Sequence, residues 1–323
     1  MDIIWILLLI LLAVFLLIGL YYLWQFWQGK FVIYNSNNLG NLLLYYFSGL
    51  AKAWQRGENF IWSWWNHTGK PMHPILAQLP TSVPLNSEMQ KQLQGLSINT
   101  AYAVTEWENP QGWLRVMQPT VQEIMAACLQ GMGHDTQHQE TNPIVIHFRC
   151  SDGPFNRHPS YAWNTYAWYT QILERIKADS SYKLQRLLSM TKPIVKHITL
   201  LACHTHLSCP RNQHACSEYA QDFKTFLEEQ GYTVDIKCGS LDLDYATMLR
   251  ASTLIAAISS FSTLAAVARR GQSYLPMPPL NSEMSKLTSP NLQYIPGEHL
   301  HHARVKDYYD IKTVCQQLRT SSN

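Results

Sequence analysis

The sequence predicts an α/β fold, two Rossmann-like lobes preceded by an N-terminal transmembrane helix, and three observations lead to this prediction. From residue 31 onwards, short apolar β-runs alternate with segments whose apolar residues recur at helical spacing. Strands separated by helices of this length form parallel sheets with right-handed crossovers, and two such series lie on either side of about residue 140. An apolar run precedes both series. We therefore expect an anchor with a juxtamembrane segment at 1–30, an N-terminal lobe at 31–140, and a second lobe with a C-terminal extension at 141–323.

The composition excludes several classes of protein. Of the 323 residues, 46% are hydrophobic and 15% are charged, which excludes a wholly disordered chain. The 25 Lys and Arg exceed the 22 Asp and Glu by only three, and no long basic run occurs, so we expect no nucleic-acid partner. The 11 Trp and 17 Tyr favour aromatic-lined surfaces or contact with a membrane instead.

The apolar run extends from Ile3 to Trp24, and no charged residue lies between Asp2 and Lys30. A helix of this length would be ~33 Å long, which is enough to cross the hydrocarbon core of a bilayer. A cleaved signal peptide would need a basic N-terminal region and a small-residue cleavage site, and neither is present. We therefore expect a single-pass membrane protein that contacts the lipid bilayer through residues 3–24.

The orientation of the expected span stays open. Lys30, Lys52 and Arg56 follow the span, and this positive charge favours a cytosolic C-terminal domain. The sequon Asn66-His67-Thr68 could be glycosylated only in a lumenal domain. Because the first strand starts soon after the span, the body should lie against the bilayer, with three aromatic residues as candidate second contacts: Trp62, Trp64 and Trp65.

Residue periodicity predicts the elements of the two lobes. Strands are expected at 31–35, 142–148, 194–203, 233–239 and 252–260. Helices are expected at 42–57, 119–131, 161–179, 215–231, 245–252 and 261–271. Residues 66–100 are rich in Pro and polar residues, and we expect them to be irregular.

The first candidate site is the turn SNNLGN at 36–41, which includes Asn38 and lies between a strand and a helix. Gly40 permits a tight turn, and Asn41 begins the helix. A helix N-terminus presents free N–H groups and partial positive charge, which suit a phosphate or a sugar hydroxyl. An ordinary strand-to-helix turn is the alternative interpretation.

The second candidate site comprises His147, Arg149 and Asp152, at the end of an expected buried strand. Strand alternation places His147 and Arg149 on the same side. Ligands of open α/β sheets bind at the carboxyl ends of the strands, where a guanidinium can hold a diphosphate through two hydrogen bonds. Asp152 could orient Arg149. A buried structural pair of Arg149 and Asp152 is the alternative.

The third candidate site begins with Asp242 and Asp244 and ends where an expected strand continues into a small-residue helix. Hydroxyls and backbone amides gather at this helix start, and they again suit a phosphate. The residues concerned are Ser259, Ser260, Phe261 and Ser262. A tightly packed joint with a serine N-cap is the alternative.

In this order and spacing, the three segments resemble the fucosyltransferase superfamily, especially the α-1,2-fucosyltransferases and their O-fucosyltransferase relatives. His147, Arg149 and Asp152 match the H-x-R-x-x-D signature of that family, and Asn37 to Asn41 resemble its G-x-x-G-N-Q turn. Residues 242–266 resemble its D-D-x-x-x-M…S-T-F-S-x-x-A block. The chain departs from the family pattern at Asn37-Asn38, Leu42, Cys150-Ser151 and Thr263-Leu264.

The resemblance implies a GT-B-like glycosyltransferase that inverts the anomeric carbon and requires no metal and no other cofactor. The implied donor is GDP-fucose and the implied acceptor is a glycan; in a eukaryote the membrane would be that of the Golgi or the ER. The implied catalytic residues are Arg149, which neutralises the leaving diphosphate, together with His147 and Asp152. The implied donor-binding residues are Asn38, Gly40, Asn41, Asp244, Ser259, Ser260, Phe261 and Ser262.

Two other functions stay open: a transferase that uses another nucleotide sugar, and a non-catalytic membrane-tethered relative that binds a nucleotide sugar or a glycan. The residues from Cys203 to Cys216 contain several Cys and His. They allow a structural zinc site, a Cys209–Cys216 disulfide, or free thiols. A second group, His299, His301 and His302, is expected to be a solvated loop.

Overall fold

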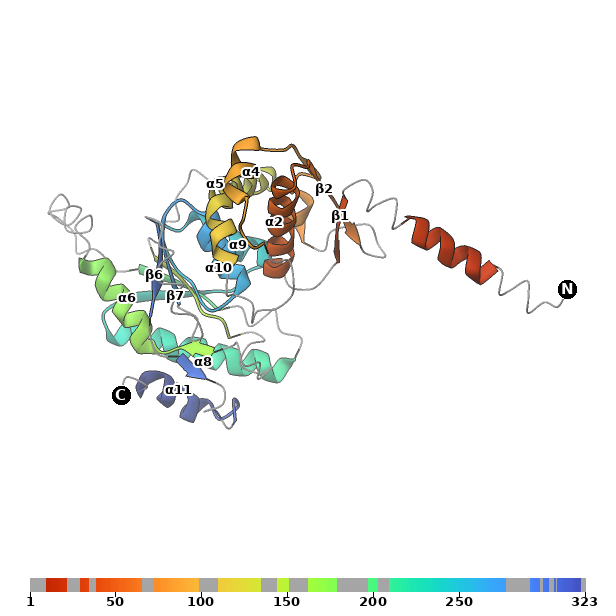
Figure 1. Ribbon diagram of the computed structural model, residues 1–323. Coiled ribbons are helices and arrows are strands. Elements are labelled where there is room, and N and C mark those ends of the chain that lie inside the picture. Colours follow the sequence, from red (N-terminus) through yellow and green to blue (C-terminus); the bar gives the residue numbers. More distant parts are fainter. Residues whose placement is uncertain are drawn as a thin grey trace.

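A six-stranded sheet forms the centre of the protein in the computed structural model (Figure 1). The structure describes residues 10–21, 30–34, 39–65, 73–98, 110–134, 144–150, 162–178, 197–202, 209–276, 291–296, 299–301, 305 and 307–320. The strands of the sheet are β4 (Ile144–His147), β6 (His197–Leu201), β7 (Thr233–Lys237), β8 (Thr253–Ile255), β9 (Gln272–Pro276) and β10 (Leu292–Ile295). All neighbouring strands in it are parallel.

The strand order is β10-β9-β8-β4-β6-β7. This is the doubly wound order of Rossmann-like folds, in which the chain starts in the middle of the sheet, runs to one edge and returns to run to the other. The order reverses between β4 and β8, which are neighbours. The predicted α/β class and the parallel sheet are therefore confirmed for the second half of the chain.

Two hydrophobic cores cover the two faces of this sheet. Ile144 and Ile146 of β4 belong to one core, and Val145 belongs to the other, because alternate residues of a strand point to opposite faces. The first core is formed with α6 (Tyr166–Ala178), α8 (Pro210–Glu229) and α11 (Ile311–Thr320). The second core is formed with α9 (Leu241–Arg250) and α10 (Ser260–Ala268). In Figure 1, α8 and α11 lie below the sheet and α6 lies at its left, whereas α9 and α10 lie on the other side, toward α2 and α5.

The first part of the chain holds a smaller, three-stranded sheet. β1 (Lys30–Tyr34) pairs in parallel with β2 (Phe60–Trp65), and β2 pairs antiparallel with the two-residue β3 (Ser82–Val83). The helices of this part are α2 (Leu39–Gln55), α3 (Pro74–Ala77), α4 (Ser87–Leu93) and α5 (Pro110–Gly131). Both α2 and α5 pack against α10, which belongs to the second part.

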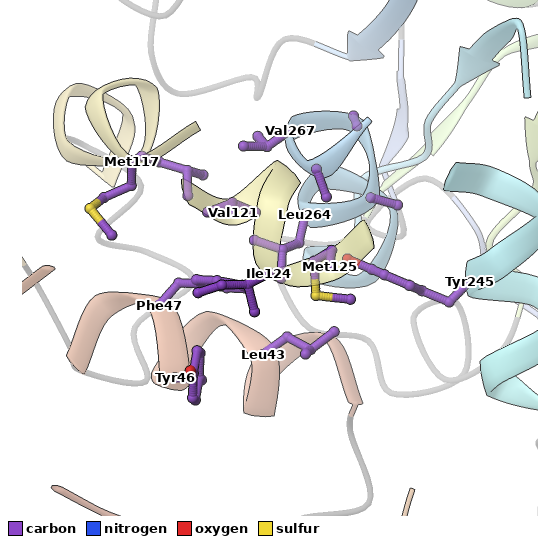
Figure 2. Close-up of a cluster of buried hydrophobic side chains, with 14 of the residues drawn as sticks. Leu43, Tyr46, Phe47, Met117, Val121, Ile124, Met125, Tyr245, Leu264 and Val267 are labelled. Carbon is purple, nitrogen blue, oxygen red and sulfur yellow. The ribbon is translucent and has the colours of Figure 1, made fainter. Parts of the chain in front are cut away.

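One core therefore extends from the first part into the second. Phe47 of α2 and Val121 of α5 lie together with Leu264 and Val267 of α10 in this core (Figure 2). The packing of α2 and α5 on α10 brings the start of α2 to the large sheet, which matters for the candidate site.

Two expectations for the first part are wrong. Residues 66–100 contain α3, β3 and α4 rather than only irregular structure. Trp62 is 3% exposed, and its indole N–H donates to the carbonyl of Pro80 over 2.6 Å. It packs edge-on against Tyr46 of α2, so Trp62 is a core residue and not a bilayer contact. The side chains of Trp64 and Trp65 lie outside the described residues.

Other differences concern short strands and helix starts. The strand β5 (Ala162–Asn164) precedes α6 and pairs antiparallel with β11 (His299–His301). His299 and His301 therefore lie in a strand and not in the expected loop; three residues are too few to show a strand period. The helices α5 and α8 each begin at a proline, earlier than expected, because proline lacks the N–H that a first helical turn leaves unpaired.

Residues 10–21 of the expected span form a helix that projects away from the body (Figure 1). Its large apolar side chains are all exposed: Ile10, Leu11, Leu12, Val14, Phe15, Leu16, Leu17, Ile18, Leu20 and Tyr21. Among the residues that the structure describes, none of the helices is long and apolar enough to cross a membrane. Residues 3–9 and 22–24 of the expected span lie outside the described residues.

Candidate functional site

The second and third candidate segments meet where the strand order of the large sheet reverses. Arg149 follows β4, and Ile258 lies in the connection from β8 to α10. A guanidinium Nη1–H of Arg149 donates to the carbonyl of Ile258 over 2.8 Å. Ligands of doubly wound sheets bind at this place, outside the carboxyl ends of the two strands that flank the reversal. Arg149 thus lies at the ligand-binding position of its fold class.

His147 lies on the same side of the chain as Arg149. Its ring lies 5.8 Å from the ring of Phe261, between centroids, and Phe261 belongs to the first turn of α10. His147 is only 8% exposed. The prediction from strand alternation is confirmed, because Arg149 reaches the connection between β8 and α10 and His147 reaches the first turn of α10.

The first candidate segment reaches the same place from the other part of the chain. The hydroxyl of Ser260 donates to Oδ1 of Asn41 over 2.7 Å. A Cβ added to Gly40 would lie against the backbone N of Phe261, 2.6 Å from its Cα and 2.8 Å from Oγ of Ser260. Gly40 therefore lets the first turns of α2 and α10 approach each other, since any side chain would separate them.

This contact corrects the expected role of Gly40. The helix α2 begins at Leu39, so Gly40 lies within its first turn and Asn41 does not start it. The glycine permits a close approach of two helices rather than a tight turn. Asn38 lies outside the described residues, as does Asp152.

Three polar groups of the third segment stabilise the local structure. Ser259 is the N-cap of α10, where its hydroxyl accepts from the N–H of Phe261 over 3.3 Å. The hydroxyl of Ser262 is fully buried and donates to the carbonyl of Ala257 over 3.1 Å. The carboxylate of Asp244 is in a residue that is 2% exposed and accepts from the N–H of Gly239 over 3.0 Å. These contacts match the alternative interpretation of a packed strand–helix joint, and Ser260 is the serine that reaches another segment.

Asp242 holds a different connection. Its Oδ1 accepts from the N–H of Ile75 over 3.0 Å and so ties the start of α9 to α3. This bond is a second link between the first and second parts of the chain near the candidate site. The carboxylate of Asp242 thus helps to hold the two parts together.

The sequence did not predict the groups that bind the main chain at Arg149 and Cys150. The indole N–H of Trp163 donates to the carbonyl of Arg149 over 2.9 Å. The next residue, Cys150, forms a disulfide with Cys216 of α8. The alternation of side chains along the extended chain after β4 indicated that Cys150 points to the face opposite to Arg149. No sequence pattern indicated the contact of Trp163, because its short strand was not predicted.

The disulfide excludes the Cys209–Cys216 pair, which was one of the three alternatives that the sequence left open for this segment. Cys209 is the exposed N-cap residue of α8, with a free thiol, and Cys216 is buried on the side of α8 that faces the sheet. The pairing of Cys216 with Cys150 also removes it from any zinc site. Among the described residues, no group of three or more His, Cys, Asp or Glu could hold a metal ion; Cys203, His204 and His206 lie outside them.

Comparisons of the chain with family models, with curated proteins and with solved structures found no match.

Proposed function

We propose that this protein is a membrane-anchored, inverting glycosyltransferase of GT-B-like, two-lobed architecture that transfers fucose from GDP-fucose to a glycan acceptor. One observation carries the proposal: three segments that resemble the fucosyltransferase motifs converge at one end of the large sheet. Arg149 contacts Ile258, His147 contacts Phe261, and Asn41 contacts Ser260. The place of convergence is the position at which doubly wound sheets bind nucleotides.

The chemistry of the site suits a nucleoside diphosphate. When the acceptor hydroxyl attacks the anomeric carbon, its oxygen bonds to that carbon and its proton is released to solvent. The bond to the diphosphate breaks, and its electron pair leaves with the diphosphate oxygen. In the proposed reaction Arg149 stabilises this growing negative charge, as donors fixed before the reaction do most effectively. The first turns of α2 and α10 add the partial positive charge of two helix N-termini close by.

A non-catalytic binder of nucleotide sugars is the second candidate function. It is favoured by the contacts of Asp244, Ser259 and Ser262, whose polar groups bond within their own loop or helix start. Fewer groups then face a donor than the motifs suggest. Arg149 at the carboxyl end of β4 suits both functions, because the same guanidinium can hold the diphosphate of a bound donor and stabilise a departing one; turnover of the donor distinguishes them.

A panel of donors tests the proposal. We would purify the full-length chain in detergent and incubate it with GDP-fucose, GDP-mannose and UDP-sugars, with and without a mixed glycan acceptor, and measure released GDP or UDP. Release from GDP-fucose supports the enzyme, and Arg149→Ala serves as the control for contaminating activity. Donor binding without release identifies the binder, and the absence of both refutes the proposal.

We also propose that the body lies outside the cytosol. The Cys150–Cys216 disulfide requires an oxidising compartment to form and persist. Of the three basic residues that follow the span, Lys30 alone lies within the ~15–20 residues over which positive charge affects orientation. In sealed vesicles from expressing cells, an added protease should digest the body only after the membrane is opened. Digestion in intact vesicles would refute this orientation.

A further inference from the structure

The main chain around Arg149 is attached to a neighbouring strand and to elements on the face of the sheet opposite to the candidate site. Phe148 donates its backbone N–H to the carbonyl of Leu201 over 2.9 Å, and the carbonyl of Arg149 accepts from the indole of Trp163 over 2.9 Å. The disulfide to Cys216 follows immediately at Cys150. Three consecutive residues of the segment are thus attached to three different elements.

The indole of Trp163 is itself firmly placed. Trp163 is 6% exposed. Its ring packs edge-on against Tyr219 at 4.5 Å and against Tyr308 at 6.0 Å, between centroids. Its strand, β5, is paired with β11. The N–H therefore has a fixed position, and so has the carbonyl that it binds.

The side chain of Arg149 leaves this segment in the other direction, toward Ile258. A displacement of its main chain would move the guanidinium relative to the β8–α10 connection. Errors of about 1 Å in the position of a catalytic group can cost ~100-fold in rate. The groups behind Arg149 thus affect chemistry that they do not touch.

We propose that Trp163 is a positioning residue for Arg149, and that the Cys150–Cys216 disulfide positions the same segment. We call these two attachments, the Trp163–Arg149 hydrogen bond and the disulfide, the clamp. The inference rests on the proposed function, because it assigns Arg149 to the leaving diphosphate. Trp163 does not contact the reacting atoms; it holds the main chain from which Arg149 extends. The two halves act on adjacent residues, so loss of either one frees the same segment.

The test compares two matched substitutions in the full-length chain in detergent. Trp163→Phe keeps an aromatic ring and removes the N–H that binds Arg149. Trp168→Phe removes an equivalent bond, from a buried indole N–H to the carbonyl of Ile295 over 3.1 Å, away from Arg149. We expect Trp163→Phe to lower kcat for GDP release from GDP-fucose about tenfold, with KM for the donor within about threefold. Trp168→Phe should keep kcat within about twofold.

Hydrogen exchange supplies a readout that does not depend on activity. In Trp163→Phe, the amides of Phe148 and Cys150 should exchange faster than in wild type, whereas Trp168→Phe should leave them unchanged. Cys216→Ala is the second variant, should Trp163→Phe fail to fold, and it should show the same local exchange and the same selective loss of kcat.

The outcomes separate the clamp from the proposed function. A wild-type chain that neither binds nor cleaves any donor refutes the function, while the exchange at Phe148 and Cys150 still decides whether the clamp exists. Trp163→Phe and Cys216→Ala variants with wild-type kcat, and with exchange no faster than in Trp168→Phe, would overturn the inference.

Discussion

The hydroxyl of Ser260 donates a hydrogen bond to Oδ1 of Asn41 across 219 residues of sequence, over a distance of 2.7 Å. The bond joins the first turn of α10, at the reversal point of the large sheet, to the first turn of α2, in the first part of the chain. Together with the close approach at Gly40, it brings the first candidate segment into direct contact with the third. The stability of the protein and the geometry of the candidate site should therefore depend on the same few atoms.

The first prediction concerns this hydrogen bond. Asn41→Ala and Ser260→Ala should each lower the free energy of unfolding by about 1 kcal/mol, the usual net contribution of one such bond. The double variant should lose clearly less than the sum of the two, because either substitution alone already removes the bond. Urea unfolding of the four proteins measures the coupling. Strictly additive losses would show that the two side chains do not interact.

The second prediction concerns Gly40. In Gly40→Ala the added methyl would lie 2.6 Å from the Cα of Phe261, so α2 and α10 must separate, and we expect a loss of about 1–3 kcal/mol. Gly112→Ala in α5 is the matched control, since its Cβ would meet Leu96 at an ordinary 3.7 Å. Because alanine favours a helix over glycine, the control should be neutral or more stable. Equal melting temperatures for the two variants would contradict the close approach.

The third prediction concerns Arg149. Arg149→Ala should lower turnover of the donor ~100-fold or more, which corresponds to about 3 kcal/mol of transition-state stabilisation. Arg149→Lys should recover only part of the rate, because it keeps the charge but loses the two-pronged geometry. Donor affinity should fall less than turnover, since the diphosphate gains charge only as the bond breaks. His147→Ala should be milder. Near-normal transfer by a folded Arg149→Ala variant would remove Arg149 from the mechanism.

The fourth prediction concerns the cysteines. Burial raises the pKa of the Cys128 thiol to about 12, and that of Cys315 to about 12. At pH 8 both should react with iodoacetamide about 1,000-fold more slowly than an ordinary thiol, whereas the exposed Cys209 should react readily. Cys150 and Cys216 should be labelled only after unfolding and reduction. Mass spectrometry of the labelled peptides checks each site, and fast labelling of Cys150 without reduction would refute the disulfide.

The same raised pKa values predict how stability depends on pH. When unfolded, these thiols lose their protons near their ordinary pKa of about 9, while the folded protein keeps them up to about 12. Between these values the unfolded state binds fewer protons, so the free energy of unfolding should fall as pH rises. Urea unfolding at pH 8 and pH 10 measures the fall. Cys128→Ala should reduce the slope, and an unchanged slope would contradict the buried thiol.

The fifth prediction concerns the expected anchor. Among the residues whose side chains the structure describes, both hydrophobic cores begin no earlier than Leu39. A chain without residues 1–29 keeps β1 and should fold, with the melting temperature of the full-length chain, and it should no longer need detergent. Circular dichroism and gel filtration check this. An unfolded truncated chain would show that the apolar segment is part of the fold.

The α/β class and most strands of the large sheet could be predicted from the sequence. Periodicity reports which face of an element is buried, and β4, β6, β7 and β8 all fall within expected strands. Strands of two or three residues are too short to show a period, so β3, β5 and β11 were missed. The longer strands β2, β9 and β10 were missed as well. Trp62 shows a second limit: an aromatic residue suits a membrane surface and a protein core equally well, and only its packing against Tyr46 distinguishes them.

The sequence by itself places Arg149 and His147 at the end of a strand and on one side of it, because alternation along a strand is a local property. It cannot place Asn41 against Ser260, Trp163 behind Arg149, or Cys150 beside Cys216, because each of these contacts joins elements whose relative position depends on how whole faces pack. Arg269 is a further example: it lies in the last turn of the helix expected at 261–271, but it is 2% exposed and donates to Oγ of Ser273 over 3.0 Å. The periodicity of apolar residues shows which face of each element is buried. Only the tertiary structure shows against which other element that face packs.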